Sequence, residues 1–186
     1  SSNDTTPTLS ITADRGATVQ VFDAALLLGT ASPTSTPGVY SFTPSQPLAS
    51  GNHRFTARAT DAVGNISGPS AEVALTIDTS APAAPQITAL LDDIAPRTGP
   101  LSNGGSSNDS LPTFTITAET GSRVQILHGP TPLGFATETS TPGIYTFTPA
   151  SPLSDGTYSF TATAADAAGN TSGTSSPFNF ILDTIK

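Results

Sequence analysis

The sequence contains no cysteine, methionine or tryptophan, and only 11% of its 186 residues are charged. Without cysteine no disulfide can form, so a hydrophobic core or bound ions must hold each domain together. The longest apolar run is AALLL at 24–28, which is too short for a signal peptide or a transmembrane helix. We therefore expect an internal segment of a longer protein.

Basic residues are also scarce, with 6 Lys and Arg against 14 Asp and Glu and a net charge of −8. A surface that binds phosphates needs clustered basic side chains. The sequence thus predicts neither nucleic acid nor a membrane as a partner, and the positions of the acids become the informative feature.

Small, β-branched and turn-forming residues dominate the chain, including 16 Gly and 17 Pro. Sparse Lys and Glu disfavour long solvated helices, whereas Gly and Pro at short intervals supply turns between short strands. This composition predicts an all-β protein.

The chain repeats itself with an offset of 105 residues. Residues 1–16 match residues 106–121, and STPGVYSFTP at 35–44 matches STPGIYTFTP at 140–149. About 40 of the 81 superimposed positions are identical and no insertion is needed. Two successive domains therefore share one fold.

Residues 82–105 have no counterpart before Ser1, so the first domain is predicted to lack the opening segment of the second. The boundary is placed in the proline-rich TSAPAAP at 79–85, a short, semi-stiff linker. We predict one repeat domain at 1–79, truncated at its start, and a complete one at 80–186.

Apolar residues alternate with polar residues over several short segments of each repeat, which is typical of strands with one buried face. In the second repeat strands are predicted at 86–91, 112–118, 123–127, 133–139, 144–149, 157–165 and 177–182. About seven short strands in roughly 105 residues predict an immunoglobulin-like β-sandwich.

Tyr158 follows a tight turn at the start of the penultimate strand of this sandwich. That position predicts a tyrosine corner, in which the hydroxyl bonds to upstream backbone. The first repeat has His53 there. We interpret this histidine as a corner residue rather than a metal ligand.

Acidic residues recur at the repeat spacing although charge is rare: positions 4 and 109, 14 and 119, 61 and 166, 78 and 183. The loop DAVGN at 61–65 returns as DAAGN at 166–170. Asp, Asn and Gly are also ordinary turn residues. Each loop therefore admits two interpretations, a turn or a set of oxygen ligands.

The direction of the strands brings several of these acids to one end of the second sandwich. The loops with Glu119 and Asp166 are expected at the end where that domain begins, close to Asp78 at the exit of the first domain. Crowded carboxylates repel unless a cation neutralises them, and Ca²⁺ prefers such oxygen ligands. We predict an interdomain Ca²⁺ held by Asp78, Thr79, Glu119, Asp166 and Asn170.

A second acidic group is expected at the opposite end of the second domain, near Asp183. Its members are Asp92, Asp93, Asn108 and Asp109. Either they help to join a following domain or they hold an ion of their own. The repeat-equivalent positions Asp4, Asp14, Asp61 and Asp183 are predicted to form incomplete sites.

Several motifs together resemble the tandem bacterial Ig-like repeats of giant surface adhesins: DTSAPAAPQITALLDD, GGSSNDSLPTFTITAETGS, STPGIYTFTP and DGTYSFTATAADAAGNTSG. The resemblance implies an extracellular extender region of a biofilm or host-attachment protein exported by a type I system. It also implies that Ca²⁺ at the junctions stiffens the array, with ligands at Asp78, Glu119 and Asp166 and support from Asn170. The implied partners are neighbouring repeats of the same chain, with the cell or biofilm surface reached by other parts of the parent protein.

The alternative is a carbohydrate- or protein-binding module, which usually presents exposed aromatic side chains. Most Phe and Tyr residues are used by the alternating core pattern, leaving Phe22 and Phe135. An enzyme is not expected, because neither His53 nor His128 recurs at the repeat spacing and no nucleophilic triad is indicated. We expect a monomer.

Overall fold

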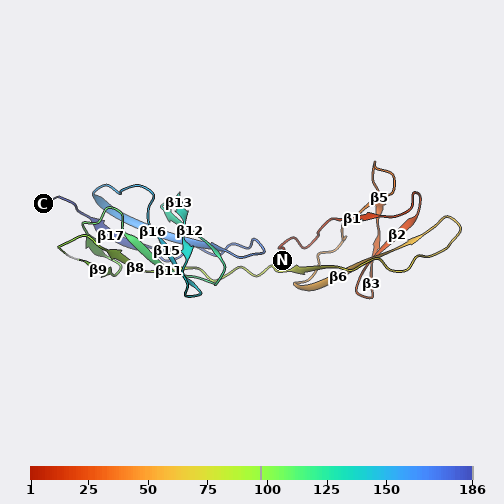
Figure 1. Ribbon diagram of the computed structural model, residues 1–186, viewed down its shortest axis with the longest axis horizontal. Helices are drawn as coiled ribbons and strands as arrows, with labels where there is room; N and C mark the ends of the chain where they lie inside the picture. Colours follow the sequence, from red (N-terminus) through yellow and green to blue (C-terminus); the bar gives the residue numbers. More distant parts are fainter. Residues whose placement is uncertain (97, 186) are drawn as a thin grey trace. The chain divides into compact units, whose positions relative to one another are not determined.

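The computed structural model describes residues 1–96 and 98–185 (Figure 1). Contacts divide the chain into unit 1, Ser1–Thr79, and unit 2, Ser80–Lys186. Arg97 and Lys186, both within the predicted second domain, lie outside the described residues. Within those residues the secondary structure is strands and turns, and no helix has the length and apolarity needed to cross a membrane.

Unit 2 is a sandwich of two five-stranded sheets. One sheet has the order β10 (Gly105–Ser107), β17 (Phe178–Leu182), β16 (Gly156–Ala165), β12 (Arg123–His128), β13 (Thr131–Phe135). The other has the order β14 (Thr137–Glu138), β15 (Ile144–Phe147), β11 (Thr113–Thr117), β8 (Gln86–Asp92), β9 (Gly99–Leu101). The all-β immunoglobulin-like fold predicted from the sequence is confirmed.

The core of unit 2 consists of the alternating apolar positions of both sheets. Phe114 and Ile116 of β11 are fully buried, as are Phe160 of β16 and Phe180 of β17. The rings of Phe114 and Phe160 meet edge to face with centroids 4.9 Å apart. Facing aromatic side chains thus fill the space between the two sheets.

Unit 1 has the same architecture with fewer strands. Its larger sheet has the order β3 (Leu26–Thr30), β2 (Thr18–Asp23), β6 (Gly51–Thr60), β7 (Val73–Ile77). Its smaller sheet has the order β1 (Leu9–Thr12), β5 (Val39–Phe42), β4 (Ser32–Pro33). Each of these strands corresponds to one of β11–β17 at the repeat spacing.

The opening strand is the main difference between the units. In unit 2, β11 pairs with β15 on one side and with β8 on the other. In unit 1, β1 pairs with β5 and lies at the edge of its sheet. Only a bridge from Ser2 to Ile77 remains where β10 pairs with β17 in unit 2. Within the described residues, β5 is therefore the one strand neighbour of β1, whereas β11 has two.

The strands of unit 2 are more divided than the sequence suggests. Its described residues form ten strand segments rather than about seven. The segment predicted at 133–139 splits into β13 and β14, and β9 and β10 were not predicted. The residues of these two strands, GPL and GSS, have turn composition, and they are extended because they pair with β8 and β17.

The predicted corner residues are confirmed in both units. The Tyr158 hydroxyl donates to the Ser154 carbonyl oxygen at 2.7 Å. In unit 1 the His53 Nε2 lies 2.8 Å from the carbonyl oxygen of Ala49, the position equivalent to Ser154. His53 therefore has a structural role at the corner.

Candidate metal-binding loops

The loops that carry Glu119 and Asp166 lie at the same end of unit 2. The last residue of β11, Thr117, pairs with Gln86, the first residue of β8. The first residue of β12, Arg123, pairs with Ala165, the last residue of β16. Both loops are therefore at the end where the linker enters unit 2, as the strand directions predicted.

The loop at 166–170 closes on its own aspartate. The Asp166 Oδ1 accepts the backbone N–H groups of Ala168 at 2.8 Å and Asn170 at 2.9 Å. Its Oδ2 accepts the Asn170 side-chain N–H at 2.8 Å. Gly169 has a φ of 93°, in the left-handed region that favours glycine. The recurring acid, glycine and amide are therefore the parts of one turn.

The loop at 61–65 has the same geometry. The Asp61 Oδ1 accepts the backbone N–H groups of Val63 and Asn65, and Oδ2 accepts the Asn65 side chain at 2.8 Å. The hydrogen bonds from the asparagine side chains lower the pKa of Asp61 and Asp166 from the usual value of 3.8. Both carboxylates are therefore anionic at neutral pH while they hold their loops closed.

The Glu119 side chain is exposed, but two side chains that were not predicted as functional hold its loop in place. The Tyr145 hydroxyl donates to the Glu119 carbonyl oxygen at 2.8 Å. The Glu138 carboxylate accepts the N–H groups of Gly143 at 2.7 Å and Gly121 at 3.1 Å. Burial and the nearby Glu138 charge raise the pKa of Tyr145. This tyrosine therefore keeps its proton and serves as a donor.

A specific signal could have identified one of these two residues. Tyr145 recurs as Tyr40, whose hydroxyl donates to the carbonyl oxygen of Asp14 at 2.9 Å. Glu138 is replaced by Pro33 in the first repeat. Glu138 is therefore not one of the acids that recur at the repeat spacing, and the repeat gives no signal for it.

In unit 1, Asp78 and Thr79 follow the end of β7. Asp78 is half-buried, and its N–H donates to the Ser2 carbonyl oxygen at 2.9 Å. The Thr79 hydroxyl lies 2.7 Å from the hydroxyl of Ser50. Asp14 is exposed, whereas the Asp4 carboxylate accepts the Thr6 N–H at 2.9 Å in a local turn.

The second acidic group of unit 2 is organised around Ser107. Its hydroxyl donates to the Asp92 Oδ2 at 2.8 Å and accepts the Asp109 N–H at 2.9 Å. Asp92 also accepts the Ile94 N–H, and Asp109 accepts the Leu111 N–H. The side chains of both aspartates are buried, and the hydrogen bonds that satisfy them close the adjoining turns.

The remaining predicted ligands of this group are separate from that network. Asp93 is exposed, and the Asn108 amide donates to the Ala95 carbonyl oxygen at 3.0 Å. The Asp183 N–H donates to the Ser107 carbonyl oxygen, so Asp183 lies beside the group as predicted. Among residues 1–96 and 98–185, no three acidic or histidine side chains gather in a metal-binding arrangement.

Comparison with known families assigns both domains of the chain to one family. The family model described as bacterial Ig-like domain matches residues 1–79 and again residues 85–184. The chain belongs to this family. The two bacterial Ig-like domains coincide with unit 1 and with nearly all of unit 2. Comparison with curated proteins gave no match.

Solved structures are similar to these bacterial Ig-like domains in fold. The fibronectin(III)-like modules of Clostridium thermocellum CbhA are 16% identical with a TM-score of 0.54, over 98% of this chain and 87% of that one. The BSP domain of a biofilm associated protein is 21% identical with a TM-score of 0.39, over 100% and 29%. A tetra-tandem repeat from the extending region of a large adhesion protein is 22% identical with a TM-score of 0.36, over 98% and 46%.

Proposed function

We propose that these bacterial Ig-like domains are spacer modules in the extracellular part of a bacterial surface adhesin, and that Ca²⁺ joins successive modules. The observation that carries this proposal is the tandem repetition of one sandwich at a constant 105-residue spacing. Repetition of a whole domain adds length and repeats the loops at which domains join. The parent protein would use other regions to reach its target.

The chemistry of the loops at the linker end of unit 2 fits Ca²⁺. Glu119 offers an exposed carboxylate, and Asp166 offers one that its hydrogen bonds keep ionised. Ca²⁺ takes about six to eight oxygen ligands from carboxylates, amides and backbone carbonyls. In the proposal Asp78 and Thr79 add oxygens from the residues that precede the linker, and Asn170 adds its amide.

The role of the ion in this proposal is mechanical. The linker at 79–85 is only semi-stiff, so without the ion the repulsion between the acids leaves the domains able to reorient. Bound Ca²⁺ supplies a shared positive charge that favours one orientation. Extracellular calcium modules bind at about 10⁻⁴–10⁻³ M, so the modules would be filled outside the cell and empty inside it.

A calcium titration followed by thermal unfolding tests the site. The unfolding midpoint should rise with Ca²⁺ up to about 10 mM, because a ligand that binds the native state stabilises it. Asp166→Asn should abolish this rise, since it removes the charge but keeps one oxygen to accept the loop N–H groups. Asp61→Asn is the matched control, in the unit 1 loop that has the same hydrogen bonds, and it should leave the rise intact. A midpoint unaffected by Ca²⁺ in the unmodified chain would exclude the site.

Small-angle scattering tests the mechanical role separately. With Ca²⁺ the distance distribution should be that of one fixed arrangement, and EDTA should broaden it. If Ca²⁺ raised the unfolding midpoint but the scattering profile did not change with EDTA, the ion would stabilise a domain without stiffening the joint.

A further inference from the structure

β3 forms one edge of the larger sheet of unit 1 and carries exposed leucines. Leu26 is 66% exposed and Leu27 is 48% exposed, and no charged residue occurs in Leu26–Thr30. In unit 2 the equivalent strand β13 has β12 as its one strand neighbour among the described residues, although β8, β9 and β10 are present. The edge of β3 is therefore not the place of an opening strand. A neutral, apolar edge of this kind is suited to pairing with another strand.

The backbone groups of Leu27 face the free side of this edge. Asp23 and Leu26 pair across the two-residue turn at 24–25, and the next pair joins Phe22 to Leu27. The pair that closes a two-residue hairpin exchanges hydrogen bonds, and hydrogen-bonded pairs alternate along an antiparallel ladder. The register of this ladder shifts only after Leu27. The N–H and C=O groups of Leu26 therefore point to β2, and those of Leu27 point away from it.

The equivalent edge of unit 2 is blocked by a proline. Pro132 stands at the repeat position of Leu27, and it pairs with Leu127 at the matching place in the ladder. Proline has no N–H and occurs in sheets where that group would face solvent. Thr131 stands at the position of Leu26. The same position thus has a free N–H and an exposed leucine in unit 1, and it has neither in unit 2.

The edge of β3 is complementary to a second copy of itself. In a two-fold antiparallel pair centred on Leu27, the N–H of each Leu27 donates to the C=O of the other. The three leucines are symmetric around this residue, so Leu26 of each chain lies opposite Leu28 of the other. Apolar side chains then meet apolar side chains, which is a favourable cross-strand pairing. The strands carry no charge, so the net charge of −8 on each chain adds no repulsion at the contact itself.

We propose that two copies of the chain associate through β3, which joins the larger sheets of two unit 1 domains into one continuous sheet across a two-fold axis. The pairing takes its affinity from main-chain hydrogen bonds and from the burial of Leu26 and Leu27. One short strand buries little area, so the association is weak, with a dissociation constant of about 1 μM–1 mM. Two chains pair here in place of the monomer expected from the sequence, and the contact does not depend on the Ca²⁺ proposed above.

Disulfide formation from a single introduced cysteine tests the register, because the chain contains no other cysteine. Leu27→Cys places two thiols opposite each other in a hydrogen-bonded pair, with Cα atoms about 5.5 Å apart, which a disulfide can bridge. Leu26→Cys is the matched control. Its thiol is more exposed, but its copy in the other chain lies on the diagonal at about 7–8 Å. Under mild oxidation Leu27→Cys should form the covalent dimer at least about tenfold faster.

Analytical ultracentrifugation measures the association itself. The unmodified chain should show a monomer–dimer equilibrium at concentrations up to about 1 mM. Leu27→Pro introduces the residue of unit 2, which removes the outward N–H and keeps the β2–β3 hydrogen bonds. It should weaken the dimer at least about tenfold. Pro132→Leu gives unit 2 the same edge and should produce species larger than a dimer.

Three outcomes would overturn the proposal. The first is no concentration-dependent association of an unmodified chain that circular dichroism shows to be folded. The second is equal association of the unmodified and Leu27→Pro chains, which would place the contact elsewhere on the molecule. The third is a covalent dimer that forms as fast from Leu26→Cys as from Leu27→Cys, which would mean that the thiols meet by random collision. If Leu27→Pro does not fold, the two cysteine variants decide the question alone.

Discussion

At the scale of single residues, His53 shows how one structural position is kept with different chemistry. Its Nδ1 lies 2.6 Å from the Asp23 carboxylate and its Nε2 lies 2.8 Å from the Ala49 carbonyl oxygen. Both partners are hydrogen-bond acceptors, so this geometry favours the protonated ring, in which both nitrogens are donors. In that form an imidazolium and its counter-ion stand where unit 2 has a neutral tyrosine.

The stability of unit 1 should therefore depend on pH through His53. The bond to the Ala49 carbonyl and the bond to Asp23 raise the pKa of His53 above 6.5. Burial raises the pKa of Asp23, but hydrogen bonds from the Arg54 N–H and from His53 outweigh it and lower this pKa overall. A raised histidine pKa stabilises the fold fully below pH 6.5, and this contribution is lost as the pH rises through the folded-state value.

Thermal unfolding between about pH 5.5 and pH 9 measures this dependence. The midpoint of unit 1 should fall as the pH rises across that interval. The control is His53→Tyr, which introduces the unit 2 residue and should flatten the profile. An unchanged slope in this variant would assign the titration to another group.

The role of a single residue was predictable from the sequence where its position recurs in both repeats, and not where it does not recur. The repeat placed Tyr158 and His53 at the same corner, and both bond to the predicted upstream backbone. Glu138 was missed because unit 1 has Pro33 there, although its carboxylate holds two loop N–H groups. The acids of the DAVGN and DAAGN loops were located from the sequence, but whether each carboxylate closes a turn or binds an ion was left open.

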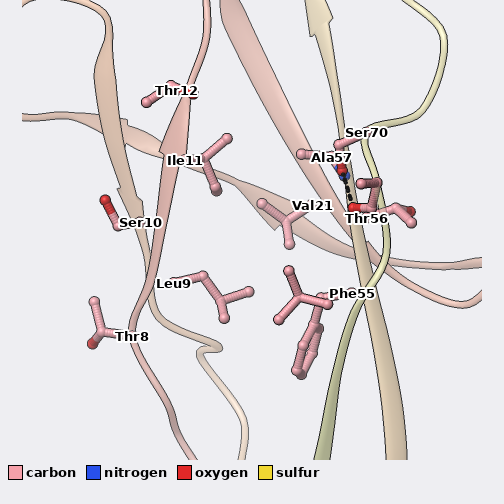
Figure 2. A pocket seen from close by; sticks show the side chains of 12 residues that line it. Thr8, Leu9, Ser10, Ile11, Thr12, Val21, Phe55, Thr56, Ala57 and Ser70 are labelled. Carbon is pink, nitrogen blue, oxygen red and sulfur yellow. Dashed lines mark hydrogen bonds between the residues drawn. The ribbon is translucent and has the colours of Figure 1, made fainter.

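At the scale of elements, serine side chains in the segment that follows β16 accept hydrogen bonds from the backbone of that strand, as a neighbouring strand would. The Ser175 hydroxyl accepts the Ala162 N–H at 2.9 Å, and the Ser172 hydroxyl accepts the Ala164 N–H at 2.9 Å. Ser70 and Ser67 make the same bonds to Ala57 and Ala59 in unit 1. These bonds are buried in unit 2 and exposed in unit 1. In unit 1, Ser70 and Ala57 line an open apolar groove beside β1, together with Leu9, Ile11 and Phe55 (Figure 2).

The two units should therefore respond differently to the same substitution. Ser175→Ala leaves the buried N–H of Ala162 without its acceptor, which should lower the free energy of unfolding of unit 2 by about 1–3 kcal/mol. Ser70→Ala exposes the Ala57 N–H to water, so unit 1 should lose less than about 1 kcal/mol. Urea unfolding of each variant measures both values. Equal losses would show that water does not reach the groove of unit 1.

Elements were predictable where alternation and burial act together. The apolar alternation of β11, β15 and β16 identified strands that bury one face. β9 and β10 carry no such pattern, because their extended form comes from pairing with β8 and β17. Local composition cannot reveal a strand that is formed only by its neighbours.

At the scale of the whole molecule, two domains of one fold should differ in stability. Unit 2 buries Ile87 and Leu90 of β8 in its core, and no strand of the described part of unit 1 takes their place. Burying an aliphatic side chain contributes about 1.5–3 kcal/mol, so the two together contribute about 3–6 kcal/mol. The groove beside β1 is the structural origin of this difference.

Calorimetry of the full chain should accordingly show two unfolding transitions, with unit 1 melting first. A difference of 1 kcal/mol shifts the midpoint of a domain of 60–100 residues by about 4–8 °C, so the transitions should be separated by at least about 10 °C. Ser175→Ala should move only the upper transition, and a change of pH through the His53 titration should move only the lower one. A single transition that both changes shift together would mean that the units unfold as one cooperative body, and stability could then not be assigned domain by domain.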